Sequence, residues 1–376
     1  MAEADLAARP LPLPDAVALV LQGGGALGSF QAGVYEALDQ RGIAIDWVAG
    51  ISIGAVNAAL IAGNAPDRRV AALTAFWEEA SSSLPTFPLW DGDQSREHLH
   101  QWSAAVVAMT GVPGFFGPRW MPPFLACPGS EAALSFYDST PLIRTLDRLV
   151  DWDLLNDGPV RLSVGAVEVQ SGNFTFFDTT ERRIDARHIL ASGALPPGLP
   201  PVEIDGKLWW DGGLVSNTPL THILDFQTED MLVFQVDLFS AANQALPKTI
   251  NDVLARAKEI QFSSRTRQVS DMLLKLRRER EAIRAVLAKL PEELTHDPDV
   301  ARLHGLAAEN ALSLVQLIYR ANAWEGGARD YEFSARTMNE HWSAGRAAVA
   351  ETMTKSSLLA SNILDGKTAS YDLLPR

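Results

Sequence analysis

The chain has 376 residues, of which 47% are hydrophobic and 21% are charged, so it can bury a large globular core. Its 32 basic and 46 acidic residues give a net charge of −14, which disfavours nucleic-acid binding and adhesion of the whole molecule to anionic membranes. The single cysteine, Cys127, excludes an intramolecular disulfide and a multi-cysteine metal site, and it fits a reducing compartment.

The N-terminal segment shows no targeting signal. Residues 1–15 contain acidic residues and prolines, and they lack the basic start and apolar core of a signal peptide. We therefore interpret them as an N-terminal extension. No run of about 18 apolar residues occurs, so no transmembrane helix is expected. These features predict a cytoplasmic protein whose contact with membranes is peripheral.

The first elements alternate between strand and helix patterns. Residues 16–22 form a continuous apolar run, which is typical of a buried parallel strand. A glycine cluster and apolar residues at helical spacing follow it. Residues 43–48 predict a second strand, and residues 55–62 predict a helix of small residues after a tight turn. This order predicts an α/β fold with a mostly parallel sheet.

Residues 84–135 interrupt this alternation and are rich in proline, glycine, tryptophan and phenylalanine. A long segment of this kind inside a compact domain is often functional. Two interpretations stay open, a lid or lining of a binding site and a packed irregular insertion. Strand patterns return at residues 160–169, 173–177 and 231–238.

The C-terminal part has a different character. Residues 251–290 and 301–320 are charged and amphipathic and predict long helices. We therefore expect a catalytic α/β domain over residues 16–240, a helical region over 241–354 and a loosely attached tail over 355–376.

The first motif is Gly23-Gly24-Gly25-Ala26-Leu27-Gly28, between a predicted strand and a predicted helix. Backbone N–H groups of such a turn lie at the positive end of the helix, where they can bind a phosphate or a developing oxyanion. The letters also fit a dinucleotide fingerprint, with Asp46 at the end of the second predicted strand as its acidic residue. A tight turn without any ligand is a further alternative.

The second motif is Gly50-Ile51-Ser52-Ile53-Gly54, a GxSxG sequence at another strand-to-helix turn. The two glycines permit the sharp bend that exposes the serine between them. The motif has a predicted strand before it, a predicted helix after it and the glycine loop nearby. This context favours Ser52 as a nucleophile over a structural serine.

A nucleophilic serine needs a base, and histidine is the usual one. None of the seven histidines lies in an obvious strand-end loop with a partner acid. An α/β-hydrolase would also place several strands between the glycine loop and the serine, and here there is room for one helix and one strand. We interpret the histidines as surface or core residues: His98, His100, His188, His222, His296, His304 and His341.

The third motif is Asp211-Gly212-Gly213, which follows the apolar run KLWW. An aspartate at a strand end can point into a cleft beside the first two turns and take a proton directly from Ser52. Alone, the three letters indicate a common turn. Together with the other motifs, they favour Asp211 as the base.

GGGALG, GISIG and DGG, in this order, resemble the motif set of patatin-like phospholipases. Residues 191–196 and 200–202 resemble the family's segment before its aspartate, so the likeness covers about residues 16–240. The resemblance implies a three-layer α/β/α sandwich and hydrolysis of lipid acyl esters by a Ser–Asp dyad without histidine. It implies Ser52 as nucleophile and Asp211 as base, with three oxyanion donors: Gly24, Gly25 and Ala26.

Leu27 departs from the family pattern, because many relatives carry Arg or Lys at this position, and the difference leaves phospholipid specificity open. The C-terminal part resembles that of a bacterial subgroup with an appended domain. A catalytically silent lipid-binding protein on the same fold remains an alternative. The prediction includes a lipid or acyl-ester substrate, no cofactor, no metal and no nucleic acid, and it leaves the oligomeric state open.

The basic run at residues 275–280 lies in a predicted helix with apolar positions. It is consistent with a helix that rests on an anionic bilayer. It is equally consistent with a surface helix packed on its own domain, and this is the commoner case.

Overall fold

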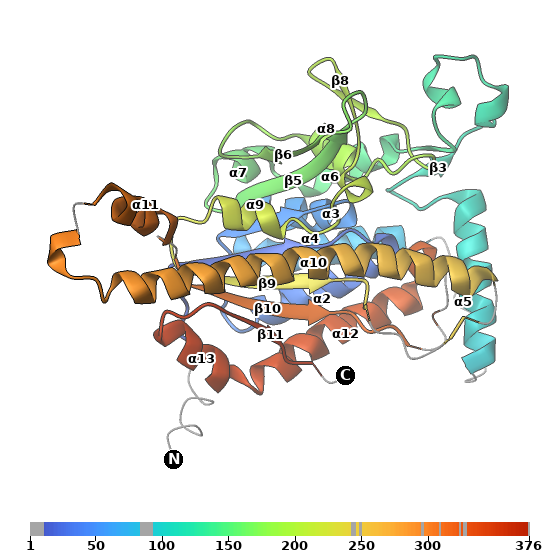
Figure 1. Cartoon of the computed structure of the whole chain (residues 1–376). Helices are drawn as coiled ribbons and strands as arrows, with labels where there is room; N and C mark the ends of the chain where they lie inside the picture. The colour runs from blue at the N-terminus through green and yellow to red at the C-terminus, as the bar shows by residue number, and fades with distance from the viewer. Residues whose placement is uncertain are drawn as a thin grey trace.

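The computed structural model describes residues 11–82, 93–241, 246–247, 250–294, 297–307, 310–322, 325 and 329–374. A sheet in the order β11-β10-β9-β1-β2-β5-β8-β7, with β6 beside β5, forms the centre of the fold (Figure 1). Its strands are β1 (Ala16–Leu21), β2 (Trp47–Gly50), β5 (Arg161–Glu168), β6 (Phe174–Asp178), β7 (Val202–Ile204), β8 (Lys207–Asp211), β9 (Met231–Asp237), β10 (Leu312–Ile318) and β11 (Ala369–Asp372).

Most neighbouring strands run parallel. In the described central sheet, the pairs β1–β2, β1–β9, β9–β10, β10–β11 and β2–β5 are parallel, and the pairs β5–β6, β5–β8 and β7–β8 are antiparallel. The α/β class and the mostly parallel sheet expected from the sequence are therefore confirmed. The antiparallel strands lie at one end of the sheet, and β8 ends there with Asp211.

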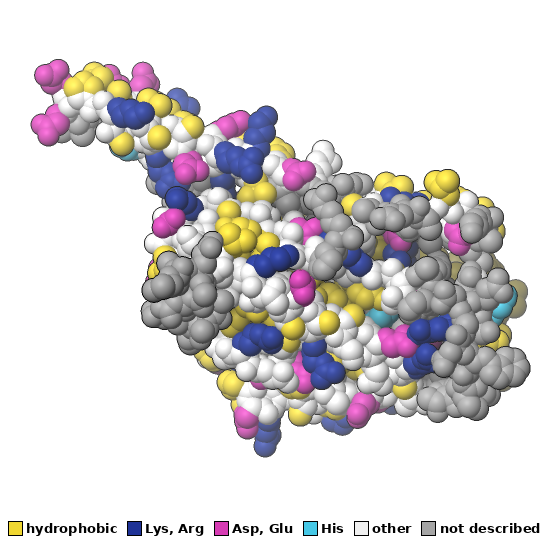
Figure 2. All heavy atoms as spheres, turned by 90° about the horizontal axis from the view of Figure 1, so that it is seen from below, with side chains coloured by type: hydrophobic (Ala, Val, Ile, Leu, Met, Phe, Trp, Pro, Cys, Tyr) yellow, Lys and Arg dark blue, Asp and Glu magenta, His cyan; other side chains and the backbone are white. Residues whose placement is uncertain are grey.

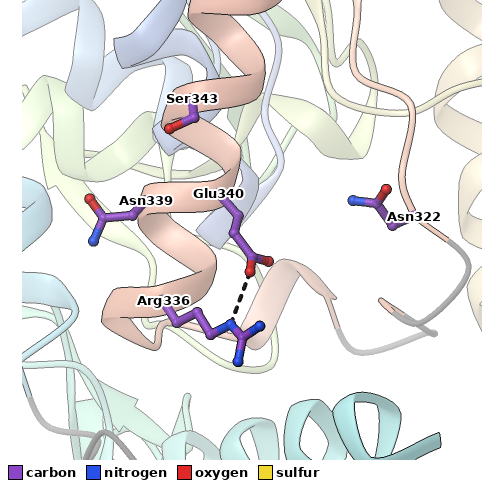
Figure 3. A pocket seen from close by; sticks show the side chains of 5 residues that line it. All are labelled: Asn322, Arg336, Asn339, Glu340 and Ser343. Carbon is purple, nitrogen blue, oxygen red and sulfur yellow. Dashed lines mark hydrogen bonds and ion pairs between the residues drawn. The ribbon is translucent and has the colours of Figure 1, made fainter. Parts of the chain in front are cut away.

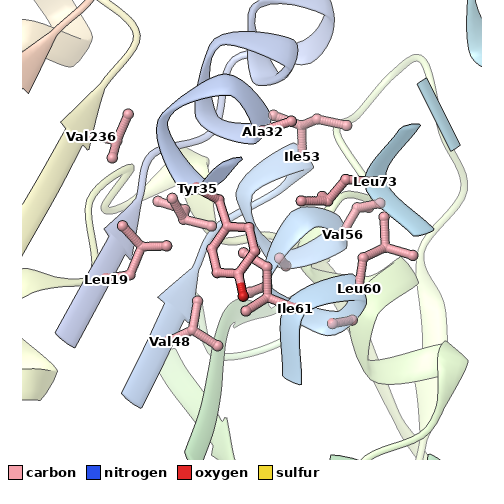
Figure 4. Packing of buried hydrophobic residues seen from close by; sticks show 14 of the residues in the cluster. Leu19, Ala32, Tyr35, Val48, Ile53, Val56, Leu60, Ile61, Leu73 and Val236 are labelled. Carbon is pink, nitrogen blue, oxygen red and sulfur yellow. The ribbon is translucent and has the colours of Figure 1, made fainter. Parts of the chain in front are cut away.

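The sheet buries side chains on both faces, as the continuous apolar run of β1 predicts. Val17, Leu19 and Leu21 face the large core, while Ala18 and Val20 face a smaller core on the other side. This alternation is the period-2 geometry of a strand covered on both sides. Figure 4 shows the large core, in which Leu19 and Val48 of the sheet lie beside Tyr35.

Helices cover both faces of the sheet. The large core packs under α2 (Gly28–Asp39), α3 (Ile53–Ala62), α4 (Pro66–Ala80), α8 (Ala186–Ser192) and α12 (Ala335–Met353). The small core includes residues of α9 (Leu220–Asp225). The other helices are α5 (Asp93–Thr110), α6 (Thr140–Leu149), α7 (Trp152–Asp157), α10 (Ile250–Leu287), α11 (Pro298–Ala307) and α13 (Ser356–Leu364).

The C-terminal part is not purely helical, and this corrects the sequence prediction. Residues 301–320 contain the end of α11 and then strand β10, whose side chains are buried on both faces. The expected loose tail holds α13 and β11, which pairs with β10. A short apolar run buried on both faces has no distinctive period, so sequence pattern alone cannot separate strand from helix there.

The segment at residues 84–135 is more regular than expected. Helix α5 occupies much of it, and residues 83–92 lie outside the described residues. Two short strands, β3 (Gly117–Pro118) and β4 (Tyr137–Asp138), then pair and close a loop that stands away from the body of the molecule (Figure 1).

Helix α10 runs along β9 and β10. Arg256, near its start, donates to the carbonyl of Ala241 after β9, and Arg277 donates to the carbonyl of Asn310 before β10. The far end of α10 and α11 form an arm on which acidic, basic and hydrophobic side chains are intermixed (Figure 2). Among the described helices, none is long and apolar enough to cross a membrane.

Candidate active site

Ser52 occupies a strained turn between β2 and α3. Its φ of 55° and ψ of −123° lie in a region that non-glycine residues rarely adopt. The turn is so tight that a Cβ on Gly54 would lie 2.3 Å from the carbonyl oxygen of Leu21, and one on Gly50 would lie 2.3 Å from that of Gly54. Both glycines of the motif are therefore required, and the half-buried Ser52 is presented at the N-terminus of α3.

Strand register explains why Asp211 lies beside Ser52. Gly50 of β2 is paired with Val164 of β5, so Ser52, two residues later, stands at the level of Ala166. Ala166 in turn is paired with Asp211 of β8. The structure thus brings together two residues that are far apart in the sequence, and the Ser52 hydroxyl lies close enough to the Asp211 carboxylate to stabilise its charged form.

The Asp211 carboxylate is almost completely buried, with 2% of the residue exposed. Burial raises its pKa to about 6, because desolvation disfavours the charged form. The Gly213 N–H, which donates at 2.7 Å, opposes the rise, as do the Ser52 hydroxyl and the positive charge of Lys258. A carboxylate with a pKa of about 6 is mostly ionised at neutral pH.

The glycine loop lies against the same turn. A Cβ on Gly23 would be 3.0 Å from the Ser52 Cβ, and the Gly23 carbonyl accepts from Asn217 at 2.8 Å. Gly24 precedes and Gly25 begins a short 3-10 helix, η1 (Gly25–Leu27), whose first N–H groups have no intrahelical partner. Gly28 then begins α2, and Gly212 and Gly213 begin the 3-10 helix η4 (Gly212–Leu214) after Asp211.

A buried polar network holds this loop in place. The Gln31 side chain donates to the carbonyl of Gln22 at 2.6 Å, and Asn57 donates to Gln31 at 2.9 Å. Asn57 accepts from Trp77 at 3.0 Å. The three side chains and Gln22 are all buried, so the network fixes the loop and its N–H groups before any substrate binds.

The segment that precedes β7 also contacts the nucleophile turn. The Ser52 N–H donates to the Ser192 hydroxyl at 3.1 Å, and a Cβ on Gly193 would lie 3.9 Å from the Ser52 Cα. The Asp211 N–H donates to the carbonyl of Ala194 at 3.0 Å. The sequence block around Ser192 therefore positions both members of the pair.

Sequence reasoning missed a cation that the C-terminal part supplies. Lys258 of α10 forms an ion pair with Asp330 of the 3-10 helix η6 (Arg329–Tyr331), and its charge acts on Asp211. The backbone of Asp330 packs on the glycine loop, because a Cβ on Gly25, whose φ is +57°, would lie 2.3 Å from the Asp330 carbonyl oxygen. Motif spacing gave no signal for Lys258, since it comes from a helix more than 200 residues after Leu27.

The histidines lie elsewhere. His222 pairs with Asp178 at 2.9 Å, and Ser163 donates to the same carboxylate at 2.6 Å. This group resembles a triad in composition, but Ser163 lies near the start of β5, whereas Ser52 follows the end of the parallel strand β2. It is a buried structural cluster at the other edge of the sheet.

The remaining histidines give no alternative base. His188 belongs to the capping box of α8 with Asp185, and His341 pairs with Glu325 at 3.4 Å. His100 is buried beside Thr337, whereas His98 and His304 are exposed. Within the described part of the chain, no histidine hydrogen-bonds Ser52 or Asp211, and His296 lies outside that part.

The dinucleotide interpretation is wrong. Asp46 lies before β2 instead of at its end, and its carboxylate accepts from the Val17 N–H at 2.8 Å. It is therefore at the opposite edge of the sheet from the glycine loop. A ribose hydroxyl could not reach both features at once, because a dinucleotide binds at the carboxyl ends of the strands.

The described residues contain no group of three or more His, Cys, Asp or Glu side chains arranged to hold a metal ion. A hollow of about 570 Å³ on α12 is lined by Asn322, Arg336, Asn339, Glu340 and Ser343 (Figure 3). Neither Ser52 nor Asp211 lines it, and Glu340 is paired there with Arg336, so the hollow is separate from the serine site.

The chain belongs to the family of patatin-like phospholipases. The family profile described as patatin-like phospholipase matches residues 19–224, more than half of the chain. A second profile, described as patatin phospholipase, matches residues 260–362. The second match covers much of α10, as well as α11, strand β10 of the central sheet and α12, which packs on the large core.

Curated relatives share only this part of their length. A lysophospholipase nte1 of Aspergillus terreus is 26% identical over 60% of this chain, which corresponds to 12% of that protein. The patatin-like phospholipase domain-containing protein 7 of Rattus norvegicus is 40% identical over 70 residues, which is 5% of its length. The chain therefore spans about an eighth or less of these relatives.

Solved structures give distant likenesses. The human GIVD cytosolic phospholipase A2 matches with a TM-score of 0.37 and 12% identity, over 95% of this chain and 63% of that one. VipD of Legionella pneumophila matches with a TM-score of 0.34 and 14% identity, over 88% and 67%.

Proposed function

We propose that the chain is a serine acyl hydrolase that cleaves fatty-acyl esters of lipids through Ser52 and Asp211. One observation carries the proposal. A strained, half-buried serine at a helix N-terminus lies beside a buried carboxylate whose charged form its hydroxyl stabilises, and both lie against a fixed glycine loop. This arrangement joins a nucleophile, a base and oxyanion donors without a histidine.

In the first half of the reaction, ionised Asp211 takes the proton of the Ser52 hydroxyl while the serine oxygen attacks the ester carbonyl. The N–H groups of Gly24, Gly25 and Ala26 stabilise the negative charge that develops on the carbonyl oxygen. The ester C–O bond then breaks, and the leaving alkoxide takes the proton from Asp211. The products are a free alcohol and an acyl group bound to Ser52.

In the second half, water replaces the alcohol. Asp211 accepts a proton from the water as its oxygen attacks the acyl-serine carbonyl, and the same N–H groups stabilise the second oxyanion. When the bond to Ser52 breaks, Asp211 returns the proton to the serine oxygen. Fatty acid leaves, and both residues return to their starting protonation states.

The substrate class rests on the family and on the named relatives, which are lysophospholipases and phospholipases. We infer a lipid ester as substrate and leave its head group undefined. The missing cation at Leu27 does not remove phospholipids from this class, because Lys258 supplies a positive charge near Asp211 from another element. The single cysteine supports action in the reducing cytoplasm, with peripheral contact to the lipid.

The experiment combines covalent labelling with product analysis. A fluorophosphonate probe should label the wild-type protein at Ser52, and a panel of lipid esters should release fatty acids that mass spectrometry identifies. Ser52→Ala should remove labelling and lower kcat by about 10³-fold or more, with an unchanged circular dichroism spectrum. Ser361→Ala, which changes an exposed serine on α13, is the matched control and should still be labelled.

A catalytically silent lipid-binding protein predicts a different result. In that case, the wild-type protein would bind lipid vesicles but would neither react with the probe nor release fatty acid. Retention of more than a tenth of the activity in Ser52→Ala would also overturn the assignment of the nucleophile.

A further inference from the structure

The loop between β3 and β4, residues 119–136, exposes an unusual set of apolar side chains; we call it the aromatic loop. Trp120 is fully exposed, Phe124 is 85% exposed and Leu125 is 74% exposed. Met121, Leu134 and Phe136 are also among the exposed large hydrophobic residues. Soluble proteins seldom concentrate such side chains in one surface segment without a binding partner.

The aromatic loop has a defined structure of its own. Arg119 donates to the Ser135 hydroxyl at 3.1 Å and pairs with Glu131 at 2.9 Å, which ties the two sides of the loop together. Phe124 and Phe136 form an edge-to-face pair with ring centroids 5.9 Å apart. The polar side chains therefore hold the loop in shape while most of its apolar side chains point to solvent.

The base of the loop borders the serine site. The N–H groups of Phe136 and Tyr137 donate to the carbonyls of Pro197 and Gly198 at 3.1 and 2.9 Å. Residues 197–198 continue directly from the segment that contacts Ser52 and Asp211 through Ser192 and Ala194. The loop is thus joined by backbone hydrogen bonds to the rim of the site, and it projects from the body there (Figure 1).

We propose that the aromatic loop inserts into the surface of a neutral or zwitterionic lipid assembly and holds the Ser52 site against it. The inference rests on the proposed function, because a lipid substrate is presented at such a surface. A projecting tip that carries tryptophan, phenylalanine, leucine and methionine matches the boundary between head groups and acyl chains.

The charges of the aromatic loop and of the whole chain favour a lipid surface without net negative charge. Within residues 119–136 the only charged side chains are Arg119 and Glu131, which neutralise one another in their ion pair. The whole chain has a net charge of −14, so an anionic bilayer would repel it. The arm of α10 and α11, which the basic run suggested as a membrane surface, carries both signs of charge and is less suited to this role (Figure 2).

The test uses Cys127, which is the only cysteine of the chain and lies exposed in the aromatic loop. An environment-sensitive fluorophore on Cys127 should brighten and shift to shorter wavelength when phosphatidylcholine vesicles are added to the full-length protein. The labelled Ser52→Ala variant should respond equally, because insertion does not require catalysis. Vesicles with added anionic lipid should give a weaker response at low salt.

A triple variant measures how much the loop contributes. Trp120→Ser, Phe124→Ser and Leu125→Ser together should weaken vesicle partitioning, and hydrolysis of vesicle lipid, by about a hundredfold. Hydrolysis of a water-soluble short-chain ester should change less than about twofold, since these side chains lie on the exposed tip. The matched control changes three exposed apolar residues elsewhere and should leave all three measurements within about twofold: Met272→Ser, Leu306→Ser and Leu358→Ser.

Several results would overturn the proposal. One is a fluorophore that does not respond to vesicles, and another is equal vesicle partitioning of the triple variant and the wild type. A fluorophore signal that appears without lipid as the protein dimerises would assign the loop to a second copy of the chain instead. Failure of the wild type to cleave the soluble ester would refute the proposed hydrolase activity, while the binding measurements would still decide the role of the loop.

Discussion

Replacing Asp211 by asparagine should inactivate the protein and at the same time stabilise it at neutral pH. The substitution keeps the shape of the side chain and the acceptor for the Gly213 N–H, but it removes the buried charge. A buried group that lowers folding stability indicates a role in catalysis rather than in packing.

The size of the effect follows from the raised pKa of Asp211. The shift from 3.8 to about 6 is about 2 units, and each unit corresponds to 1.36 kcal/mol, so the ionised carboxylate costs about 3 kcal/mol of folding free energy. With about 2.1 cal/mol/K of unfolding entropy per residue, 376 residues give about 0.8 kcal/mol/K. Asp211→Asn should therefore raise Tm by about 4 °C at pH 8.

The stability difference between Asp211→Asn and the wild type should depend on pH. Below about pH 4, folded and unfolded states both hold the proton, and Asp211 contributes no difference. Between about pH 4 and 6, the unfolded state loses its proton first, so the wild type loses stability as the pH rises. The advantage of Asp211→Asn should therefore be complete above about pH 6 to 7 and should vanish near pH 4.

The assay is calorimetric unfolding between pH 4 and pH 8, together with ester hydrolysis. The matched control, Asp225→Asn, changes an exposed aspartate at the end of α9 and should alter stability by less than about 0.5 kcal/mol at every pH. An Asp211→Asn variant that melts below the wild type at pH 8, or that retains a tenth of its activity, would refute the reasoning.

Two other substitutions test the surroundings of the pair. Lys258→Met removes a charge that lowers the pKa of Asp211, so the acid limb of kcat/KM should move to higher pH. Lys258→Arg keeps the charge and should leave the acid limb in place. The control Lys275→Met, on the exposed face of the same helix, should also leave it in place. His222→Gln weakens the buried cluster around Asp178, which should lower stability by about 1–3 kcal/mol in urea unfolding. Activity per folded molecule should stay within about twofold, and a loss as large as that of Ser52→Ala would make His222 the base instead.

The sequence by itself determined the local chemistry. The apolar run of β1, the glycine loop and the GxSxG turn are contiguous patterns, because a strand-to-helix turn depends on residues that are neighbours in the chain. They were sufficient to predict the α/β class and to select Ser52 and Asp211 as candidates. The confirmed family membership agrees with those motifs.

Only the tertiary structure shows the features that depend on residues distant in the sequence, such as strand pairing and the pKa of Asp211. The pairing of β10 and β11 with the sheet requires partners that no local pattern reveals, so the pattern of residues 301–320 predicts a helix where the structure has strand β10. The pKa of Asp211 also depends on its folded surroundings, because burial raises it whereas the Gly213 N–H, the Ser52 hydroxyl and Lys258 lower it. Burial dominates and brings the pKa to about 6, close to the ordinary histidine value of about 6.5, so substitutions rather than the pH profile must identify the base.

Only the folded chain also places Lys258 and Asp330 beside the glycine loop, and the aromatic loop at the rim of the site. Composition marked residues 84–135 as unusual, but it could not say which side chains would be packed and which exposed. Burial is a property of the whole fold, because it depends on which distant segments cover a given surface.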